Sequence, residues 1–295
     1  MFTWSSERPW RYAHASVIGR SHVASATPCQ DASACEILNL AGASTLFGIV
    51  SDGAGSAPLS QIGARFACEV ILDEARAALA SGGGVGALDE EFTHGSLERF
   101  QHALARVARR AGRPVRDFAC TLLWAAVDEH RAAFAQVGDG AIVVSVAEDA
   151  GAPRGFEWVF WPQQGEYVNQ TNFAHDPRAF RALQFEAREQ RVEELALFSD
   201  GLQGLVLDVR RRVAHQRFFE PMFVAMRWAE PGRSESLCHS LQRFLASPTI
   251  ETRTDDDKSL ILASRRVPDP RPALPVVPTA PAAVVAVTLP QELRE

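Results

Sequence analysis

The sequence lacks several patterns that would assign it to a class of protein at once. Its five cysteines are an odd number, none lies in a CxxC pair, and most stand in apolar surroundings. No uncharged apolar run reaches the roughly 18 residues that a membrane span needs. Residues 1–11 carry Trp4, Glu7 and Pro9 where a secretory signal places a basic patch before an apolar block. We therefore expect a cytoplasmic protein with reduced thiols and no membrane partner.

Positive charge is also scarce. Lys and Arg number 30 against 36 Asp and Glu, which gives a formal net charge of -6 and a pI near 5.8. A nucleic-acid binder or a metal-dependent nuclease needs a basic face, so the balance argues against a nucleic-acid partner. The glycine run Gly82–Gly84 is not followed by the Gly-Lys-Ser/Thr of a phosphate-binding loop. A metal held at an acidic site fits the composition better.

The pattern of apolar residues predicts a mixture of strands and helices. With 46% hydrophobic residues the chain can build one large core. Strands are expected at 12–18, 44–50, 118–127, 132–137, 141–146, 157–161, 192–198 and 259–263, and helices at 59–79, 96–111, 218–228 and 236–246. The three runs between 118 and 146 are joined by short turns, which favours an antiparallel meander. Strands cluster around pairs of helices without strict alternation, so we expect an α+β fold with sheets packed between helix pairs.

The composition changes sharply near the C-terminus. Seven prolines fall within residues 268–295, among many alanines and valines. We therefore expect a domain over residues 1–266 and a disordered, polyproline-like tail over 267–295.

Four short aspartate motifs follow or precede the expected strands. They are Ser51-Asp52-Gly53, Gly138-Asp139-Gly140, Ser199-Asp200-Gly201 and Asp255-Asp256-Asp257. Any one of them alone is most often a surface turn. Together they suggest that distant strand ends meet in a carboxylate-rich pocket, because clustered carboxylates repel one another unless cations neutralise them.

Read in order, six segments carry a family resemblance. They are 28–31 (Pro-Cys-Gln-Asp), 50–56, 120–123, 137–140, 198–201 and 256–259. This sequence of motifs resembles the metal-dependent protein phosphatases of the type 2C (PPM) class over roughly residues 12–264, and within it a small bacterial branch with Ser-His before Pro-Cys-Gln-Asp. The resemblance implies a four-layer αββα sandwich and a serine/threonine phosphoprotein phosphatase, opposing a bacterial Ser/Thr kinase and acting as a monomer.

The resemblance also implies roles for particular residues. Asp52 would bridge two Mn²⁺ or Mg²⁺ ions, with the Gly53 carbonyl on one ion and Asp200 and Asp256 on the other. Asp31 would act through a metal-bound water. Asp139 is expected to stabilise a turn near the site. A weakly held third ion near Asp117 is a further expectation, although the spacing of Asp117 from Thr121 is one residue off the pattern.

The sequence departs from the family at the residues that handle phosphate. Ala26 and Ala54 stand where relatives carry an arginine that clamps phosphate and a histidine that donates a proton, and Gln30 replaces an acidic residue. We expect Arg20 and His22 to take over these tasks because they lie near in sequence, although a surface role for His22 is equally compatible with the pattern. The alternative is a catalytically weak or inactive module that binds metal or phosphoprotein.

Cys29 adjoins Gln30 and Asp31 and raises the question of a cysteine nucleophile. The His-Cys-x5-Arg loop of cysteine phosphatases is absent from this segment. Cys29 is therefore expected to serve packing.

Overall fold

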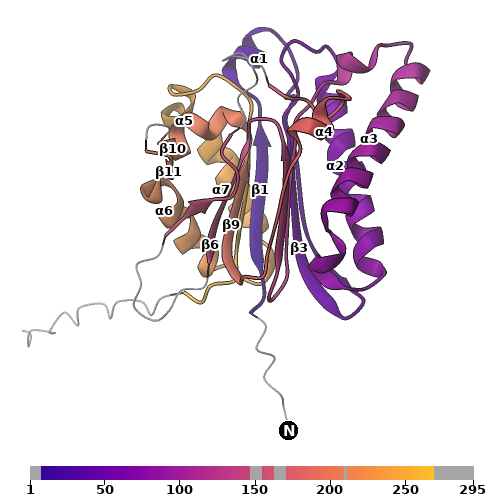
Figure 1. Cartoon of the computed structure of the whole chain (residues 1–295). Coiled ribbons are helices and arrows are strands. Elements are labelled where there is room, and N and C mark those ends of the chain that lie inside the picture. Colours follow the sequence, from indigo (N-terminus) through magenta and orange to yellow (C-terminus); the bar gives the residue numbers. More distant parts are fainter. Residues whose placement is uncertain (1–7, 147–154, 163–170, 209–210, 269–295) are drawn as a thin grey trace, which may run out of the picture.

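The computed structural model describes residues 8–146, 155–162, 171–208 and 211–268. Two β-sheets lie face to face at the centre, and a pair of long helices covers the outer face of each (Figure 1). This arrangement confirms the α+β class and the four-layer αββα sandwich. The expected tail begins at residue 267, and almost all of it lies outside the described residues.

The first sheet has six strands in the order β12-β1-β13-β9-β6-β7. Their bounds are Gly232–Arg233 for β12, Arg11–Val17 for β1, Lys258–Ser264 for β13, Val192–Phe198 for β9, Ala141–Val146 for β6 and Glu157–Trp158 for β7. Neighbouring strands are antiparallel except β12 and β1, which run parallel. The expected strands at 192–198 and 259–263 are thus confirmed at the middle of this sheet.

The second sheet has five strands in the order β2-β3-β4-β5-β8, all antiparallel to their neighbours. Their bounds are Ala32–Leu40 for β2, Ala43–Ser51 for β3, Leu122–Val127 for β4, Ala132–Val137 for β5 and Gln184–Arg188 for β8. A separate two-stranded ribbon joins β10 (Leu207–Asp208) to β11 (Val213–Ala214).

The helices divide between the two outer faces. Their bounds are Arg20–Ala24 for α1, Ser60–Ala80 for α2, Glu90–Arg110 for α3, Ala179–Ala182 for α4, Gln203–Val206 for α5, Gln216–Arg227 for α6, Glu235–Leu245 for α7 and Pro248–Glu251 for α8. Helices α2 and α3 pack on the second sheet, whereas α6 and α7 pack on the first.

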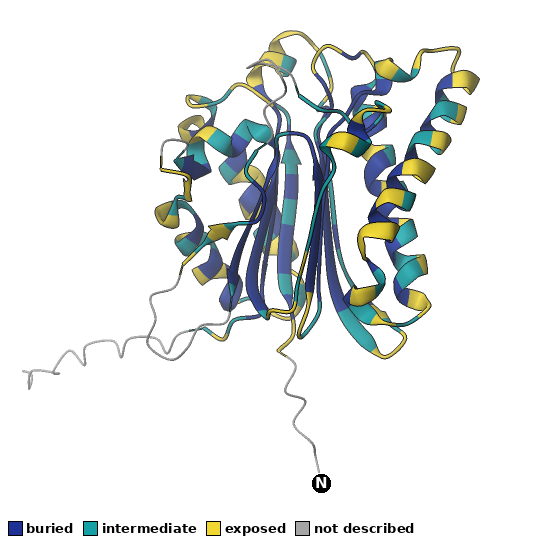
Figure 2. Ribbon diagram, viewed as in Figure 1, coloured by how far each residue is buried: buried dark blue, intermediate teal, exposed yellow. Residues whose placement is uncertain are grey.

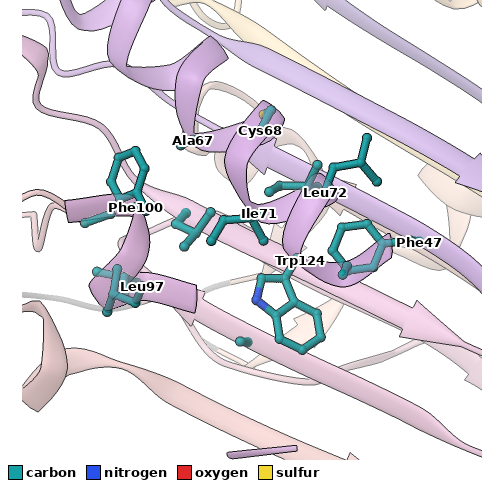
Figure 3. Close-up of a cluster of buried hydrophobic side chains, with 14 of the residues drawn as sticks. Phe47, Ala67, Cys68, Ile71, Leu72, Leu97, Phe100 and Trp124 are labelled. Atoms are coloured by element: carbon teal, nitrogen blue, oxygen red, sulfur yellow. The ribbon is translucent and has the colours of Figure 1, made fainter. Parts of the chain in front are cut away.

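Apolar residues at helical spacing explain the packing of α2. Ala64, Ala67, Cys68, Ile71 and Leu72 are all buried along one face of the helix. Figure 3 shows this face packed against α3 and the second sheet, together with Phe47 and Trp124, whose rings stack with centroids 5.7 Å apart. A second cluster of buried apolar side chains lies between the two sheets, and the central strands are mostly buried, as Figure 2 shows. The sandwich is therefore a rigid support for whatever its strand ends carry.

Several details differ from the sequence prediction, which also did not include strands β8, β10, β11 and β12. Strand β6 does not pair with β5 but lies in the other sheet beside β9, so the expected three-stranded meander is wrong. The chain changes sheets at Gly138, whose φ of +117 is open to glycine and strained for other residues. Strand β2 was not expected because Ser33, Glu36 and Asn39 interrupt its apolar alternation.

Helix α3 begins six residues earlier than expected. Asp89 caps it by accepting a hydrogen bond from the Phe92 amide at 2.8 Å, and Glu90 and Glu91 occupy the first turn. No helix in the described part of the chain is long and apolar enough to cross a membrane.

Candidate metal centre

Five aspartates lie at one end of the sandwich, the upper end in Figure 1 near α1. Asp31 directly precedes β2 and Asp52 directly follows β3. Asp139 lies in the crossover from β5 to β6, Asp200 lies two residues after β9, and Asp256 lies two residues before β13. The fold thus brings together strand ends that are far apart in sequence, as the aspartate motifs predicted.

Asp52 and Asp200 are in direct contact. A hydrogen bond joins their side chains, the charge of Asp31 acts on Asp52, and the charge of Asp200 acts on Asp31. Burial, followed by the charges of Asp31 and Asp200, raises the pKa of Asp52 well above its usual range. Burial also raises the pKa of Asp200 to about 6. Without a cation, this pair therefore retains a proton that ordinary aspartates lose.

Asp31 is the most enclosed of the five carboxylates. Burial raises its pKa to about 7, and the charge of Asp257 adds to that effect. The Ser199 hydroxyl opposes the rise by donating a hydrogen bond to Oδ2 of Asp31 at 2.7 Å. The carboxylate is thus held in one orientation beside the Asp52–Asp200 pair.

Asp139 and Asp256 complete the acidic end. Burial raises the pKa of Asp139, whose carboxylate accepts a hydrogen bond from Thr171 Oγ1 at 2.7 Å. The charge of Asp256, an exposed residue, acts on both Asp139 and Asp200. Asp139 therefore contributes to the field of the cluster in addition to any role in its turn.

The donor chemistry of this cluster fits a hard divalent cation. Within the described ranges, no three His, Cys, Asp or Glu side chains are gathered as the ligand set of one ion. Asp52 and Asp200 instead bind each other, and Asp256 faces solvent. Yet Oδ1 of Asp31 and Oδ1 of Asp200 are buried without a hydrogen-bond partner. A buried, unpaired carboxylate oxygen is costly, and a bound cation would remove that cost.

Gly53 is required by close backbone packing. A Cβ at this position would lie 2.7 Å from the Gln30 carbonyl oxygen and 2.8 Å from Cβ of Ser60. The Gly53 amide also donates to the same Gln30 oxygen at 3.2 Å. The absent side chain thus allows the segment after Asp52 to pack against the segment before Asp31.

Asp257 is the residue beside the cluster that the sequence did not single out. Its buried carboxylate accepts hydrogen bonds from the Gly19 amide at 2.6 Å and the Gln30 amide at 2.5 Å. Oδ2 of Asp257 also lies 2.9 Å from Nδ1 of His22. Asp257 therefore fixes both ends of the loop that carries α1. Asp255, Asp256 and Asp257 are consecutive, so the sequence alone did not show that the contacts of Asp257 differ from those of Asp256.

Of the departures from the family, Ala26 lies within this loop and Ala54 lies outside it. Ala26 is exposed in the turn after α1, with a φ of +55. Ala54 is buried against Ala57 and Ala119. Arg20, the first residue of α1, is exposed and open to solvent at the acidic end. The roles expected of Arg20 and His22 remain predictions.

Asp117 and Cys29 have other partners. Oδ2 of Asp117 lies 2.7 Å from Nη2 of Arg113, so its charge is already paired. Burial, together with the charges of Asp257 and Asp31, raises the pKa of the Cys29 thiol to about 12. A thiol with such a pKa is not a nucleophile near neutral pH, which agrees with the packing role expected for Cys29.

Comparisons with known proteins agree with this geometry. The family model of protein phosphatase 2C matches residues 18–246. Serine/threonine-protein phosphatase 3 of Escherichia coli (strain K12) is 35% identical over 258 residues, which cover 86% of this chain and 98% of that protein. A crystal structure of a bacterial serine phosphatase has a TM-score of 0.56 at 14% identity and covers 88% of this chain and 99% of that one. The phosphatase Stp1 from Staphylococcus aureus has a TM-score of 0.55 at 15% identity, covering 86% and 94%.

An αββα sandwich with a carboxylate cluster at one end of its sheets defines a metal-dependent phosphatase class. This chain belongs to the protein phosphatase 2C family, and the family match covers most of the described domain.

Proposed function

We propose that this protein hydrolyses phosphoserine and phosphothreonine in phosphoproteins, using two Mn²⁺ or Mg²⁺ ions held by Asp52, the Gly53 carbonyl, Asp200 and Asp256. The observation that carries the proposal is the set of carboxylates at the strand ends, where Asp31 and Asp200 present buried oxygens without partners. The relative from Escherichia coli, named as a serine/threonine-protein phosphatase, supports the choice of substrate.

The chemistry divides between the ions and the protein. Bound divalent ions of this kind lower the pKa of water and neutralise phosphoryl oxygens. Asp52 would be the ligand that the two cations share, which its contact with Asp200 and the nearby charge of Asp31 support. Oδ1 of Asp31, which no donor satisfies, would accept a hydrogen bond from the attacking water and orient it toward phosphorus.

Arg20 and His22 supply the remaining functions in this proposal. The exposed Arg20 guanidinium on α1 would bind the substrate phosphate, since a planar guanidinium matches phosphate oxygens. His22, whose Nδ1 faces Asp257, would donate a proton through Nε2 to the leaving serine or threonine oxygen. A third ion beside Asp117 would first have to displace Arg113.

The biological setting follows from the proposed substrate. A phosphatase of phosphoserine and phosphothreonine would oppose a Ser/Thr kinase or act on its targets, and we propose that it does so as a cytoplasmic monomer.

Residues 1–266 would suffice for activity. Arg265 and Arg266 hold the end of this segment through the Val192 carbonyl at 2.7 Å and Ser145 Oγ at 2.9 Å, so a chain ending at Arg266 keeps these contacts.

A second candidate is an inactive module that binds metal or phosphoprotein without turnover. Ala26 and Ala54 favour it because neither can hold phosphate or donate a proton. The phosphatase would release phosphate and the inactive module would not, whereas both would bind metal.

Phosphate release from a phosphothreonine peptide, measured against Mn²⁺ concentration, separates them. We expect release by the wild type and a loss of at least about 100-fold in Asp52→Asn, because a bridging ligand is removed. Asp73→Asn, an exposed surface change on α2, should leave the rate unchanged. If the wild type binds Mn²⁺ by calorimetry but releases no phosphate, the inactive module is correct.

A further inference from the structure

A row of side-chain hydroxyls runs from Asp31 across the gap between the two sheets. Ser259 of β13 lies beside the Asp31 carboxylate and, as a donor toward it, lowers the pKa of Asp31. Ser259 Oγ lies 2.6 Å from Ser16 Oγ of β1, and Ser16 Oγ lies 3.0 Å from Ser33 Oγ of β2. Ser33 Oγ lies 3.2 Å from Nδ1 of His14. Three consecutive hydrogen bonds thus connect Ser259, which lies beside the carboxylate, with a histidine ring.

The Asp31 carboxylate sets the direction of this row. An ionised carboxylate can only accept hydrogen bonds, so Ser259 must donate its proton to Asp31. Ser259 Oγ then accepts from Ser16, Ser16 accepts from Ser33, and Ser33 accepts from His14. His14 must therefore carry its proton on Nδ1.

Ser199 holds the same carboxylate from the other side. Its Oγ accepts the Ser259 amide at 2.9 Å, which leaves its own proton for Oδ2 of Asp31 at 2.7 Å. Both Ser199 and Ser259 are fully buried. Two hydroxyls thus restrain Asp31, while its Oδ1 remains free of donors and available to the acidic end.

The far end of the row opens to solvent. His14, Ser16 and Ser33 line a cavity of about 400 Å³ between α2 and α7, which Asp31 also lines. Burial, and then the charge of Arg233, lower the pKa of His14, so its ring is neutral near pH 7. A neutral ring carries one proton. The row requires this proton on Nδ1, whereas free neutral histidine carries it more often on Nε2.

We propose that His14, Ser33, Ser16 and Ser259 are positioning residues that form a one-directional hydroxyl chain and fix Asp31 so that Oδ1 faces the metal centre. The chain rests on the proposed function, since its purpose is to orient a carboxylate used in phosphate hydrolysis. Aligned hydrogen bonds polarise one another, so a break at Ser16 weakens the donor that Asp31 receives from Ser259.

Matched variants of the serines test the chain. In Ser259→Ala we expect the Mn²⁺ concentration for half-maximal rate to rise about 10-fold, with a smaller rise in Ser16→Ala and little change in peptide KM. Ser259→Thr and Ser16→Thr restore a hydroxyl and should recover most of the loss. Ser145→Ala removes a partly buried hydroxyl hydrogen bond to Arg266 far from the chain and should not raise the Mn²⁺ requirement.

The protonated nitrogen of His14 gives a readout that does not depend on activity. Long-range ¹H–¹⁵N spectra of the metal-free protein at a pH well above the Asp31 pKa of about 7, with His14→Gln for assignment, should show the proton on Nδ1 in the wild type. In Ser33→Ala the acceptor is gone, and the proton should move largely to Nε2. A wild-type ring protonated on Nε2 would overturn the chain.

Calorimetric Mn²⁺ binding separates failure of the chain from failure of the proposed function. If the wild type releases no phosphate but Ser259→Ala still weakens Mn²⁺ binding relative to Ser145→Ala, the chain stands and the proposed phosphatase activity is wrong. If the wild type is active and Ser259→Ala and Ser145→Ala bind Mn²⁺ equally well, the chain is wrong and the phosphatase activity stands.

Discussion

Asp52 and Asp200 share a side-chain hydrogen bond although they follow strands of different sheets. Asp52 follows β3 and Asp200 follows β9, and only the face-to-face packing of the sheets brings their carboxyl groups together. One of the two must keep a proton for the bond to exist. A divalent cation that binds here must displace that proton, so metal binding, protonation and stability are linked.

The first prediction is that the metal-free protein loses stability as the pH rises from about 4 to about 7. The folded-state pKa values of Asp200 and Asp31, about 6 and about 7, lie above the usual value of 3.8. The native state therefore binds more protons than the unfolded state in this window, and the free energy of unfolding falls with pH. Below the usual pKa both states are protonated, and the full stability is present.

Urea denaturation at a series of pH values, with a chelator or with saturating Mn²⁺, measures this effect. Each group contributes a slope of at most about 1.4 kcal/mol per pH unit. Mn²⁺ should abolish the fall, and Asp31→Asn should reduce it in the chelated protein. A chelated wild type with a flat profile over this range would contradict the pKa shifts.

The second prediction concerns Asp257. Replacing Asp257 by Ala leaves the Gly19 and Gln30 amides without acceptors in a buried place, at a cost of about 1–3 kcal/mol for each. The loop that carries α1 should loosen, and the Mn²⁺ requirement should rise. The neighbouring Asp255 is the matched control, because it binds Ser21 through its backbone carbonyl alone. Thermal melts should therefore separate Asp257→Ala from Asp255→Ala, and equal melting temperatures would argue against the restraint.

The sequence predicted those parts of the fold that local pattern determines. The continuous apolar runs at 192–198 and 259–263 are buried strands, and the spacing at 59–79 is a helix. Pairing between sheets is not a local property. The short turn at 138–140 looks like a hairpin, yet it carries the chain from one sheet to the other.

In the candidate site too, local sequence pattern predicted some features, whereas contacts between the sheets could not be predicted. Aspartate motifs at strand ends predicted that Asp52 and Asp200 would meet, since each motif marks the end of a buried strand. The row of Ser16, Ser33 and Ser259 has no sequence signal, because its members come from three strands that belong to two different sheets. Such contacts depend on side-chain direction across the sandwich, which periodicity alone does not provide.

The third prediction separates the tasks of Arg20 and His22. Arg20→Ala should raise KM for a phosphothreonine peptide about 10-fold, because a charged contact to phosphate is worth roughly 1.5 kcal/mol or more. His22→Ala should lower kcat on the same peptide about 100-fold, the contribution typical of a general acid. It should have little effect on an aryl phosphate, whose phenolate leaves without protonation.

Two substrates are therefore needed to interpret His22. If His22→Ala slows the peptide and the aryl phosphate equally, the histidine does not protonate the leaving group. Its role is then to hold the loop through Asp257, to which its Nδ1 lies at 2.9 Å. For Arg20, an unchanged KM in the alanine variant would remove it as the phosphate-binding residue.

The fourth prediction compares two glycines that lie three residues apart beside the metal centre. A Cβ at Gly201 would collide with the Asp257 carbonyl oxygen, whereas a Cβ at Gly204 meets nothing within 4 Å. Gly201→Ala must push β13 and the segment after β9 apart, which displaces Asp200 relative to Asp256. Gly204→Ala lies in α5 and should be neutral or slightly stabilising, since alanine favours helix by about 1 kcal/mol. We expect Gly201→Ala to lose Mn²⁺ binding in calorimetry and to melt at a lower temperature, and Gly204→Ala to match the wild type in binding. Equal Mn²⁺ affinities in the two variants would show that the metal centre does not depend on this close approach.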